Sequence, residues 1–382
     1  MPCKKRVRLN NTPQVLIVGL FKIIYFFTLL FFLKSPLFST ESHIKQKSFH
    51  IQLVEKAVLQ YQQKNNIPGI AVVLYYQGKP YFLPFGSANL RSKKPITENT
   101  IFELGSITKS FTAILLAIEV LDGKIKLSDP VARYLPGLRE FTGPFSKVTF
   151  QHLATHTSGF MRVIPEKDRK TYADIVKYLR NWHPTHSPGT HYEYSNFGFG
   201  ILGLALENVF QKNYFNLLSI NLLNPLQMNH TFLVVPQQWQ ADYAQGYDKN
   251  GNPAEKWPIT LMQAAGALRS SAADMRKFLA ACLNLPGTPS KIAEAIYLTE
   301  TGNFKMGANK TQVMSWMKTD FGSYSLYTKN GGVTGFATFM GFIPELQIGL
   351  VIMANKNVSN TLLGQYILQQ LGSSLAYQKF GN

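Results

Sequence analysis

Cysteine is nearly absent from this chain of 382 residues, in which Cys3 and Cys282 are the two examples. Two cysteines so far apart build neither a disulfide framework nor a cysteine-based zinc site. The eight histidines, His156 among them, form no H-E-x-x-H or H-x-x-E-H pattern, so we interpret them as surface or satisfied core residues. We therefore expect neither a metal nor a cofactor.

Acidic residues are also scarce, since 21 Asp and Glu face 39 Lys and Arg, for a net charge of +18. A nucleic-acid-binding chain would carry a dense Lys/Arg run interleaved with aromatic residues. The body of the chain has no such run, so we do not expect nucleic acid as a partner. The charge instead favours an anionic envelope surface or substrates that carry carboxylates.

Internal repeats, low-complexity linkers and the G-x-S-x-G nucleophile elbow are absent as well. These absences argue against repeat architectures and against an α/β-hydrolase. What remains is a chain that is 45% hydrophobic and can bury a large core as one domain with an insertion.

The first forty residues differ from the rest. A basic start, residues 4–8, precedes an apolar run over residues 23–33 and then Lys34, as in a secretory signal. The following "SPLFST" is a poor cleavage site, and a longer apolar stretch from Val15 can serve as an uncleaved membrane anchor. We predict a signal peptide or N-terminal anchor over 1–40 and an exported, periplasmic protein, with anchoring to the inner membrane as the open alternative.

The order of predicted elements in residues 41–382 is strands, a long helical middle, and strands again. A hairpin is expected from Gly69 onward, and three strands follow near residues 323–332, 337–344 and 348–355. Residues 106–283 are mostly helical in pattern. This order predicts an α+β fold: one antiparallel sheet formed by both chain ends and flanked by helices, with a mostly helical insertion. The α/β part covers about 41–104 and 320–382, and the helical part about 105–319.

Ser106 and Lys109 form an S-x-x-K motif at a predicted helix start. Residues three apart share a helix face, so the amine can reach the hydroxyl and activate it as a nucleophile. The same spacing occurs at Ser42 and at Ser315, and a serine at a helix start is also a common N-cap. The motif alone therefore leaves both roles open for Ser106.

Two further motifs favour catalysis. Tyr194 and Asn196, in "YEYSN", can aim a phenol and an amide in the same direction from a loop, and "YTKNGG" places Lys329, Asn330, Gly331 and Gly332 on a strand. Glycines allow a substrate backbone to approach that strand, and the lysine supplies a charge for a carboxylate. The three motifs in this order are typical of penicillin-recognising serine hydrolases.

The sequence resembles the class C β-lactamases and related D-alanyl-D-alanine peptidases and esterases over about residues 51–372. The segments that carry this likeness include "TIFELGSITKSFTA", "FQHLATHTSGF", "GALRSSAADMRKFL" and "GFIPELQIGLVIMANKN".

The resemblance implies a nucleophilic Ser106, proton transfer by Lys109 and Tyr194, and an amide-binding Asn196. It also implies that Lys329 attracts the substrate carboxylate beside Asn330 and Gly331. The N–H groups of Ser106 and Gly332 would form the oxyanion hole. Either Lys109 or an ionised Tyr194 can be the base in acylation.

Three departures from the class C pattern affect the expected substrate. Asn330 replaces the usual threonine of Lys-Thr-Gly, "FMRVIPEKD" lacks the usual glutamine, and the stretch from Leu283 to Lys329 is much shorter than in class C enzymes. We predict a monomeric serine β-lactamase that hydrolyses the β-lactam amide through a Ser106 acyl-enzyme. The alternatives are a D-alanyl-D-alanine carboxypeptidase or endopeptidase, or a carboxylic-ester hydrolase. A non-catalytic penicillin-binding regulator is less favoured, because Ser106, Lys109, Tyr194 and Lys329 are all intact.

Overall fold

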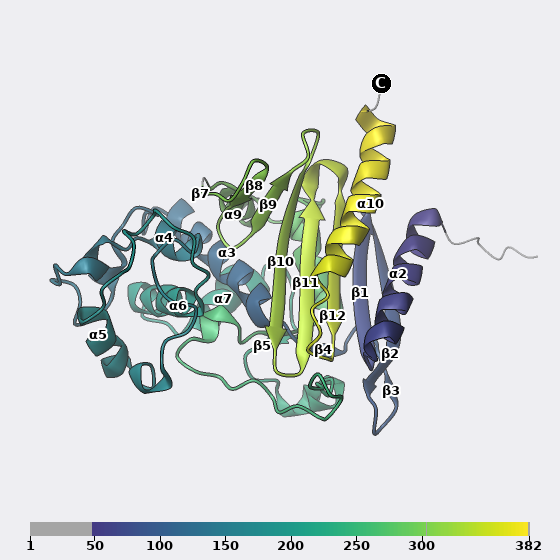
Figure 1. The fold of residues 1–382 in the computed structure, drawn as a ribbon, viewed down its shortest axis with the longest axis horizontal. Coiled ribbons are helices and arrows are strands. Elements are labelled where there is room, and N and C mark those ends of the chain that lie inside the picture. Colours follow the sequence, from purple (N-terminus) through teal and green to yellow (C-terminus); the bar gives the residue numbers. More distant parts are fainter. Residues whose placement is uncertain (1–47, 303, 381–382) are drawn as a thin grey trace, which may run out of the picture. The chain divides into compact units, whose positions relative to one another are not determined.

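A computed structural model describes residues 48–302 and 304–380 of the chain. The targeting segment expected at residues 1–40 lies outside these ranges. Within them, no helix combines the length and the apolar character needed to cross a bilayer. The described residues from His50 onward belong to one compact unit (Figure 1).

The largest element is a sheet of nine strands in the order β3-β2-β1-β12-β11-β10-β9-β8-β7. Neighbouring strands are antiparallel, and β1 pairs with β12 so that Ile70 lies opposite Ala354. The predicted α+β fold, with an antiparallel sheet completed by both chain ends, is therefore confirmed. The strands are β1 (Gly69–Tyr76), β2 (Lys79–Asn89), β3 (Lys94–Pro95), β7 (Phe304–Lys305), β8 (Lys310–Gln312), β9 (Met317–Asp320), β10 (Ser325–Val333), β11 (Phe336–Ile343) and β12 (Ile348–Ala354).

Helices cover both faces of the central strands. Helices α2 (Phe49–Asn65) and α10 (Thr361–Phe380) lie on one face, where Val58 and Ile367 join Ile352 in an apolar cluster (Figure 1). Helix α8 (Ala272–Cys282) packs against β1 and β12. Strands buried on both faces carry continuous apolar sequence, which explains why β11 and β12 have no polar alternation.

The helical middle is built around α3 (Thr108–Leu121), whose side chains are almost all buried. It packs against α6 (Asn196–Phe210), α7 (Tyr214–Leu218) and α9 (Ser290–Glu300). Helices α4 (Phe150–Ala154) and α5 (Tyr172–Arg180) complete this part. The expected helical insertion is therefore present between the strands of the two chain ends.

Two groups of short strands were not predicted from the sequence. Strands β7, β8 and β9 extend the large sheet beyond β10. A second sheet has the order β4-β6-β5, with β4 at Ile101–Glu103, β5 at Thr231–Phe232 and β6 at Arg269–Ser271. Strands of two to four residues are too short for an alternating pattern to be visible in the sequence. Strand β4 leads directly into the segment that carries Ser106.

Candidate active site

Ser106 lies in a tight turn between β4 and α3. Gly105 opens a 3-10 turn, Gly105–Ile107, with φ of 52°, and a Cβ at this position would lie 2.6 Å from the backbone nitrogen of Gly332. Glycine is therefore required here both for the backbone conformation and for the close approach of β10. Neither this turn nor α3 has a side-chain N-cap, so the capping role considered for Ser106 is not observed.

The Ser106 hydroxyl is held between two functional side chains. The Lys109 amine donates to Ser106 Oγ over 3.1 Å, and the Tyr194 hydroxyl donates to the same oxygen over 2.7 Å. Lys109 also contacts Asn196 Oδ1 at 2.7 Å and the Ala265 carbonyl oxygen at 2.5 Å. The structure thus brings together four residues that the sequence predicted from two separate motifs.

Lys109 is completely buried, and none of its hydrogen-bond partners among the described residues is a carboxylate. Burial is the main reason that its pKa lies well below the ordinary lysine value, and the positive charge of Arg162 lowers the pKa further. A buried lysine with a lowered pKa can lose its proton near neutral pH and then accept one from a hydroxyl group. The environment of Lys109 therefore suits a general base.

The other S-x-x-K spacings do not form such a pair in the described residues. Ser315 is buried and its hydroxyl hydrogen-bonds to that of Ser110 at 2.9 Å, while Lys318 lies over the ring of Tyr327. Ser42 lies outside the described residues.

Tyr194 lies two residues before the first residue of α6 and is surrounded by cations. The Nζ atoms of Lys109 and Lys329 each lie 5.0 Å from its ring centroid, and the guanidinium carbon of Arg162 lies 5.5 Å away. Any negative charge that develops on the phenol oxygen is therefore stabilised by positive charge nearby. Burial lowers the pKa of Lys329 to about 8, the Lys109 charge adds to this decrease, and Tyr194 opposes it.

Strand β10 forms one edge of the site. Gly331 packs against the nucleophile turn, because a Cβ there would lie 2.1 Å from the Leu104 carbonyl oxygen. The Thr338 hydroxyl fixes that same carbonyl oxygen at 2.7 Å. Asn330 and Gly332 are exposed on the other face of the strand, and β9 pairs with β10 only as far as Thr328, so a substrate can lie along the edge of β10 beyond that residue.

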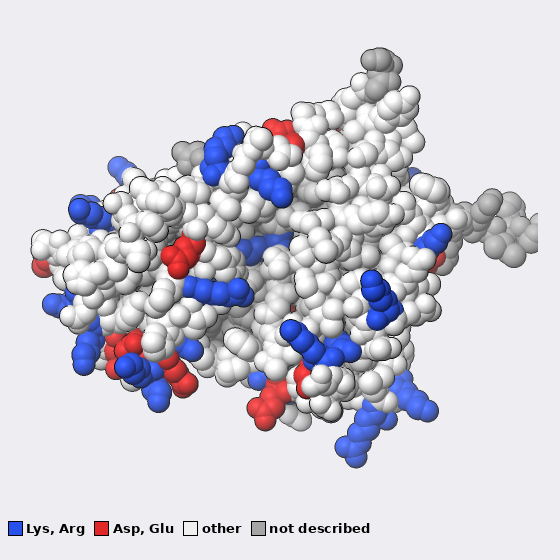
Figure 2. All heavy atoms as spheres, in the orientation of Figure 1, with Lys and Arg blue, Asp and Glu red and all other residues white. Residues whose placement is uncertain are grey.

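A cavity of about 420 Å³ opens beside Ser106. Within the part of the chain that the structure describes, Arg162 and Arg169 are its charged lining residues and no carboxylate lines it. Figure 2 shows basic side chains around the hollow at the centre of this face, between the helical part and the sheet. The other residues that line the cavity include Ser106, Asn196, Trp257, Met262, Gly332 and Val333.

The comparisons with known proteins agree with this geometry. The Beta-lactamase family model matches residues 54–370. The chain belongs to the β-lactamase family. It is 31% identical to a β-lactamase of Pseudomonas fluorescens over 340 residues, which cover 81% of this chain and 94% of that protein.

Two solved structures are similar to this chain over most of its length. A class C β-lactamase in complex with cefoxitin has 30% identity and a TM-score of 0.79, over 84% of this chain and 98% of that one. A D-alanine carboxypeptidase from Burkholderia cenocepacia has 30% identity and a TM-score of 0.77, over 85% of this chain and 99% of that one. The resemblance to class C β-lactamases is confirmed, and the protein is a serine hydrolase of this family.

His156 also contributes to the site, although it was not predicted from the sequence. Its ring lies 4.3 Å from the ring of Tyr194, and its Nδ1 accepts a hydrogen bond of 3.1 Å from the Ser195 N–H. Burial, with added effects of Lys329 and Lys109, holds the pKa of His156 well below its usual range. The imidazole is therefore neutral, and its ring packs against the ring of Tyr194. Its place in "THTSG", one of the segments of the resemblance, was the available signal.

Among the described residues, no group of three or more His, Cys, Asp or Glu is placed to hold a metal ion. The chemistry available to the side chains around Ser106 is acyl transfer by a serine nucleophile. Two proton carriers contact the hydroxyl, one of them with a lowered pKa, and a strand edge lies beside it.

Proposed function

We propose that the protein is a serine β-lactamase of class C type. The observation that carries this proposal is the double contact of Ser106 Oγ with Lys109 Nζ at 3.1 Å and with the Tyr194 hydroxyl at 2.7 Å. A serine hydroxyl needs a base within hydrogen-bond distance, and two candidates meet that requirement here.

In the first half of the reaction, Ser106 Oγ attacks the carbonyl carbon of the β-lactam. Its proton passes to Lys109 or to Tyr194, and the negative oxygen of the tetrahedral intermediate faces the N–H groups of Ser106 and Gly332. The C–N bond then breaks, and the ring nitrogen takes up the proton. The product of this step is an acyl-enzyme ester on Ser106.

In the second half, water attacks this ester. Tyr194 and Lys109 accept a proton from the water, and a proton returns to Ser106 Oγ as the C–O bond breaks. Asn196 holds the substrate amide carbonyl through its side-chain N–H, while its Oδ1 is bound by Lys109. Lys329, with a pKa of about 8, is mostly charged at neutral pH and attracts the substrate carboxylate.

A peptidase acting on D-alanyl-D-alanine ends, or a carboxylic-ester hydrolase, can use the same residues. Two observations favour this second candidate: a D-alanine carboxypeptidase is among the similar structures, and Asn330 stands on β10 where class C enzymes usually have threonine. We further propose that the protein acts as a monomer in the periplasm, with residues 1–40 as its export signal or inner-membrane anchor.

Purified protein and a Ser106→Ala variant, each mixed with a chromogenic cephalosporin, test the proposal. Absorbance follows turnover, and intact mass follows acylation of Ser106. Turnover that disappears in the variant supports a β-lactamase. A stable adduct on Ser106 without turnover indicates a penicillin-binding peptidase, and the absence of both signals directs the search to esters.

A further inference from the structure

Trp257 presents a large aromatic side chain at the cavity beside Ser106. The residue is 42% exposed and lines the cavity, in a stretch that is neither helix nor strand. Its backbone, however, is held on both sides. The N–H donates to Glu103 Oε1 over 3.0 Å, and the carbonyl oxygen accepts a hydrogen bond from the Arg269 guanidinium. The indole is therefore exposed on a fixed piece of backbone.

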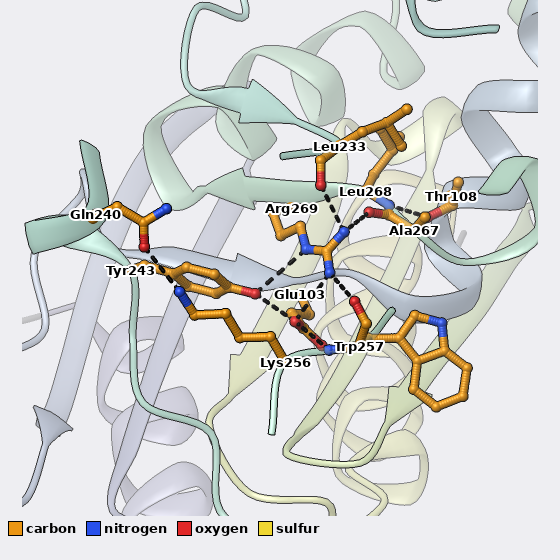
Figure 3. Close-up of polar contacts among 10 residues, drawn as sticks. All are labelled: Glu103, Thr108, Leu233, Gln240, Tyr243, Lys256, Trp257, Ala267, Leu268 and Arg269. Carbon is orange, nitrogen blue, oxygen red and sulfur yellow. Dashed lines mark hydrogen bonds and ion pairs between the residues drawn. The ribbon is translucent and has the colours of Figure 1, made fainter. Parts of the chain in front are cut away.

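The two residues that hold Trp257 form a buried ion pair. Glu103 ends β4 and Arg269 begins β6, where they lie opposite each other in register, with relative exposures of 2% and 4%. Figure 3 shows the guanidinium at the centre of the cluster and the Trp257 ring pointing away from it. Arg269 also donates to the carbonyl oxygens of Leu233, at 2.6 Å, and Ala267, at 2.7 Å.

The residue before Trp257 is anchored to the same cluster. The Lys256 amine donates to Gln240 Oε1 over 2.9 Å and lies 4.7 Å from the ring centroid of Tyr243. The Tyr243 hydroxyl in turn donates to the Glu103 carboxylate. These contacts give residues 256 and 257 one position relative to β4, which continues into the turn of Ser106.

The cavity lies on the acyl side of the scissile bond under the proposed function. Asn196, which would hold the amide carbonyl, lines it, whereas Lys329, which would hold the carboxylate of the leaving part, is not among its lining residues. Apolar side chains such as Val163, Met262 and Val333 complete its wall. An aromatic acyl group would find both apolar surface and the indole ring for stacking.

We propose that Trp257 is a specificity-determining residue for substrates whose acyl group carries an aromatic ring, and that Glu103 and Arg269 are the positioning residues that hold it. The inference rests on the proposed function, in which the acyl group occupies this cavity.

The test uses two cephalosporins that share one nucleus and differ in the acyl group, phenylacetyl or acetyl. The readout is the ratio of kcat/KM for the phenylacetyl compound to that for the acetyl compound. We expect Trp257→Ala to lower this ratio about fivefold to tenfold, through KM for the phenylacetyl compound. Trp257→Phe is the matched control and should retain most of the ratio, because it keeps an aromatic ring.

Arg269→Lys tests the positioning pair, since lysine keeps the charge but lacks the planar guanidinium fork that reaches the Trp257 carbonyl. If Arg269→Lys still unfolds cooperatively on heating, the variant is folded. Its ratio of kcat/KM for the two compounds should then fall toward the ratio of Trp257→Ala. A wild-type ratio in Arg269→Lys overturns the positioning role.

A wild-type ratio in Trp257→Ala, with Ser106-dependent turnover intact, overturns the specificity role and leaves the proposed function standing. If the wild-type protein forms an acyl-enzyme without turnover, the proposed function fails. The specificity role is then tested by the ratio of the acylation rates for the two compounds, which intact mass measures. Absence of acylation by both compounds overturns the two together.

Discussion

Two buried cations stand on either side of the nucleophile turn, and they differ in what surrounds them. Arg269 is paired with the Glu103 carboxylate at 3.4 Å, three residues before Ser106. Lys109, three residues after Ser106, contacts a hydroxyl, an amide oxygen and a carbonyl oxygen, all of them neutral.

The difference separates a structural cation from a chemical one. A buried guanidinium beside a carboxylate fixes the groups around it, as Arg269 fixes the Trp257 backbone (Figure 3). A buried cation without a carboxylate has a lowered pKa and exchanges its proton easily, as the environment of Lys109 indicates. Arginine cannot act as a base in a protein, whereas a buried lysine can, so the residue type and the neighbouring charge together separate the two roles.

The largest expected effect comes from making Lys109 permanently charged. Lys109→Arg keeps a cation in place but removes a group able to lose its proton, so kcat/KM should fall about 10²- to 10⁴-fold. Lys109→Met also removes the charge, and its kcat/KM should fall by a similar factor. Steady-state kinetics with a chromogenic cephalosporin measure both, and circular dichroism checks the fold. If Lys109→Arg keeps most of the activity, Lys109 acts by charge alone.

Breaking the structural pair should affect stability instead. Arg269→Met leaves the Glu103 carboxylate buried without its cation, and we expect the free energy of unfolding to fall by about 3–5 kcal/mol. The double variant Glu103→Leu/Arg269→Met should lose less than the sum of the two single variants, by about 0.5–3 kcal/mol. Urea unfolding measures all three. Strict additivity would show that the pair is not coupled.

A third buried cation, Lys329, changes its charge in the alkaline pH range, because its pKa is lowered to about 8. It is charged below this pH and neutral above it. Binding of a substrate carboxylate should therefore weaken as pH rises through 8, and kcat/KM for a β-lactam should fall by up to about tenfold per pH unit above it. A neutral ester without a carboxylate is the control substrate, and it should lack this alkaline limb. If kcat/KM decreases equally at alkaline pH for both substrates, a group other than Lys329 causes the decrease.

The smallest expected effect concerns Arg162, whose charge contributes to the lowered pKa of Lys109 after burial. Arg162→Gln should raise the pKa of Lys109, so that the acid limb of kcat/KM moves to higher pH. Arg162→Lys keeps the charge and should leave the limb near its original position. Because Arg162 is exposed, the shift should shrink at high salt. A limb that does not move in Arg162→Gln would leave burial as the sole cause.

The part of the site that the sequence predicted is the part encoded in local motifs. Ser106 and Lys109 share one turn of chain, Tyr194 stands just before α6, and Lys329 to Gly332 stand on β10. The central strands were predictable for a similar reason, since their apolar runs are long enough to be seen.

What the sequence did not predict depends on contacts between distant segments. Glu103, Arg269 and Trp257 acquire their roles only when β4 pairs with β6, and strands of three residues have no visible pattern. His156 gains its place only by packing against Tyr194. No spacing along the chain signals these contacts.

The pairing of β1 with β12 has a consequence for the order of synthesis and folding. Strand β1 is buried along nearly its whole length, but its partner is made almost at the end of the chain. Until β12 has been synthesised, the apolar side chains of β1, such as Val72 and Leu74, lack one neighbouring strand, and β10 has no complete sheet to hold it against Ser106. The unfinished chain is therefore both prone to aggregation and without a nucleophile site. Activity begins only after the last strand has joined the first.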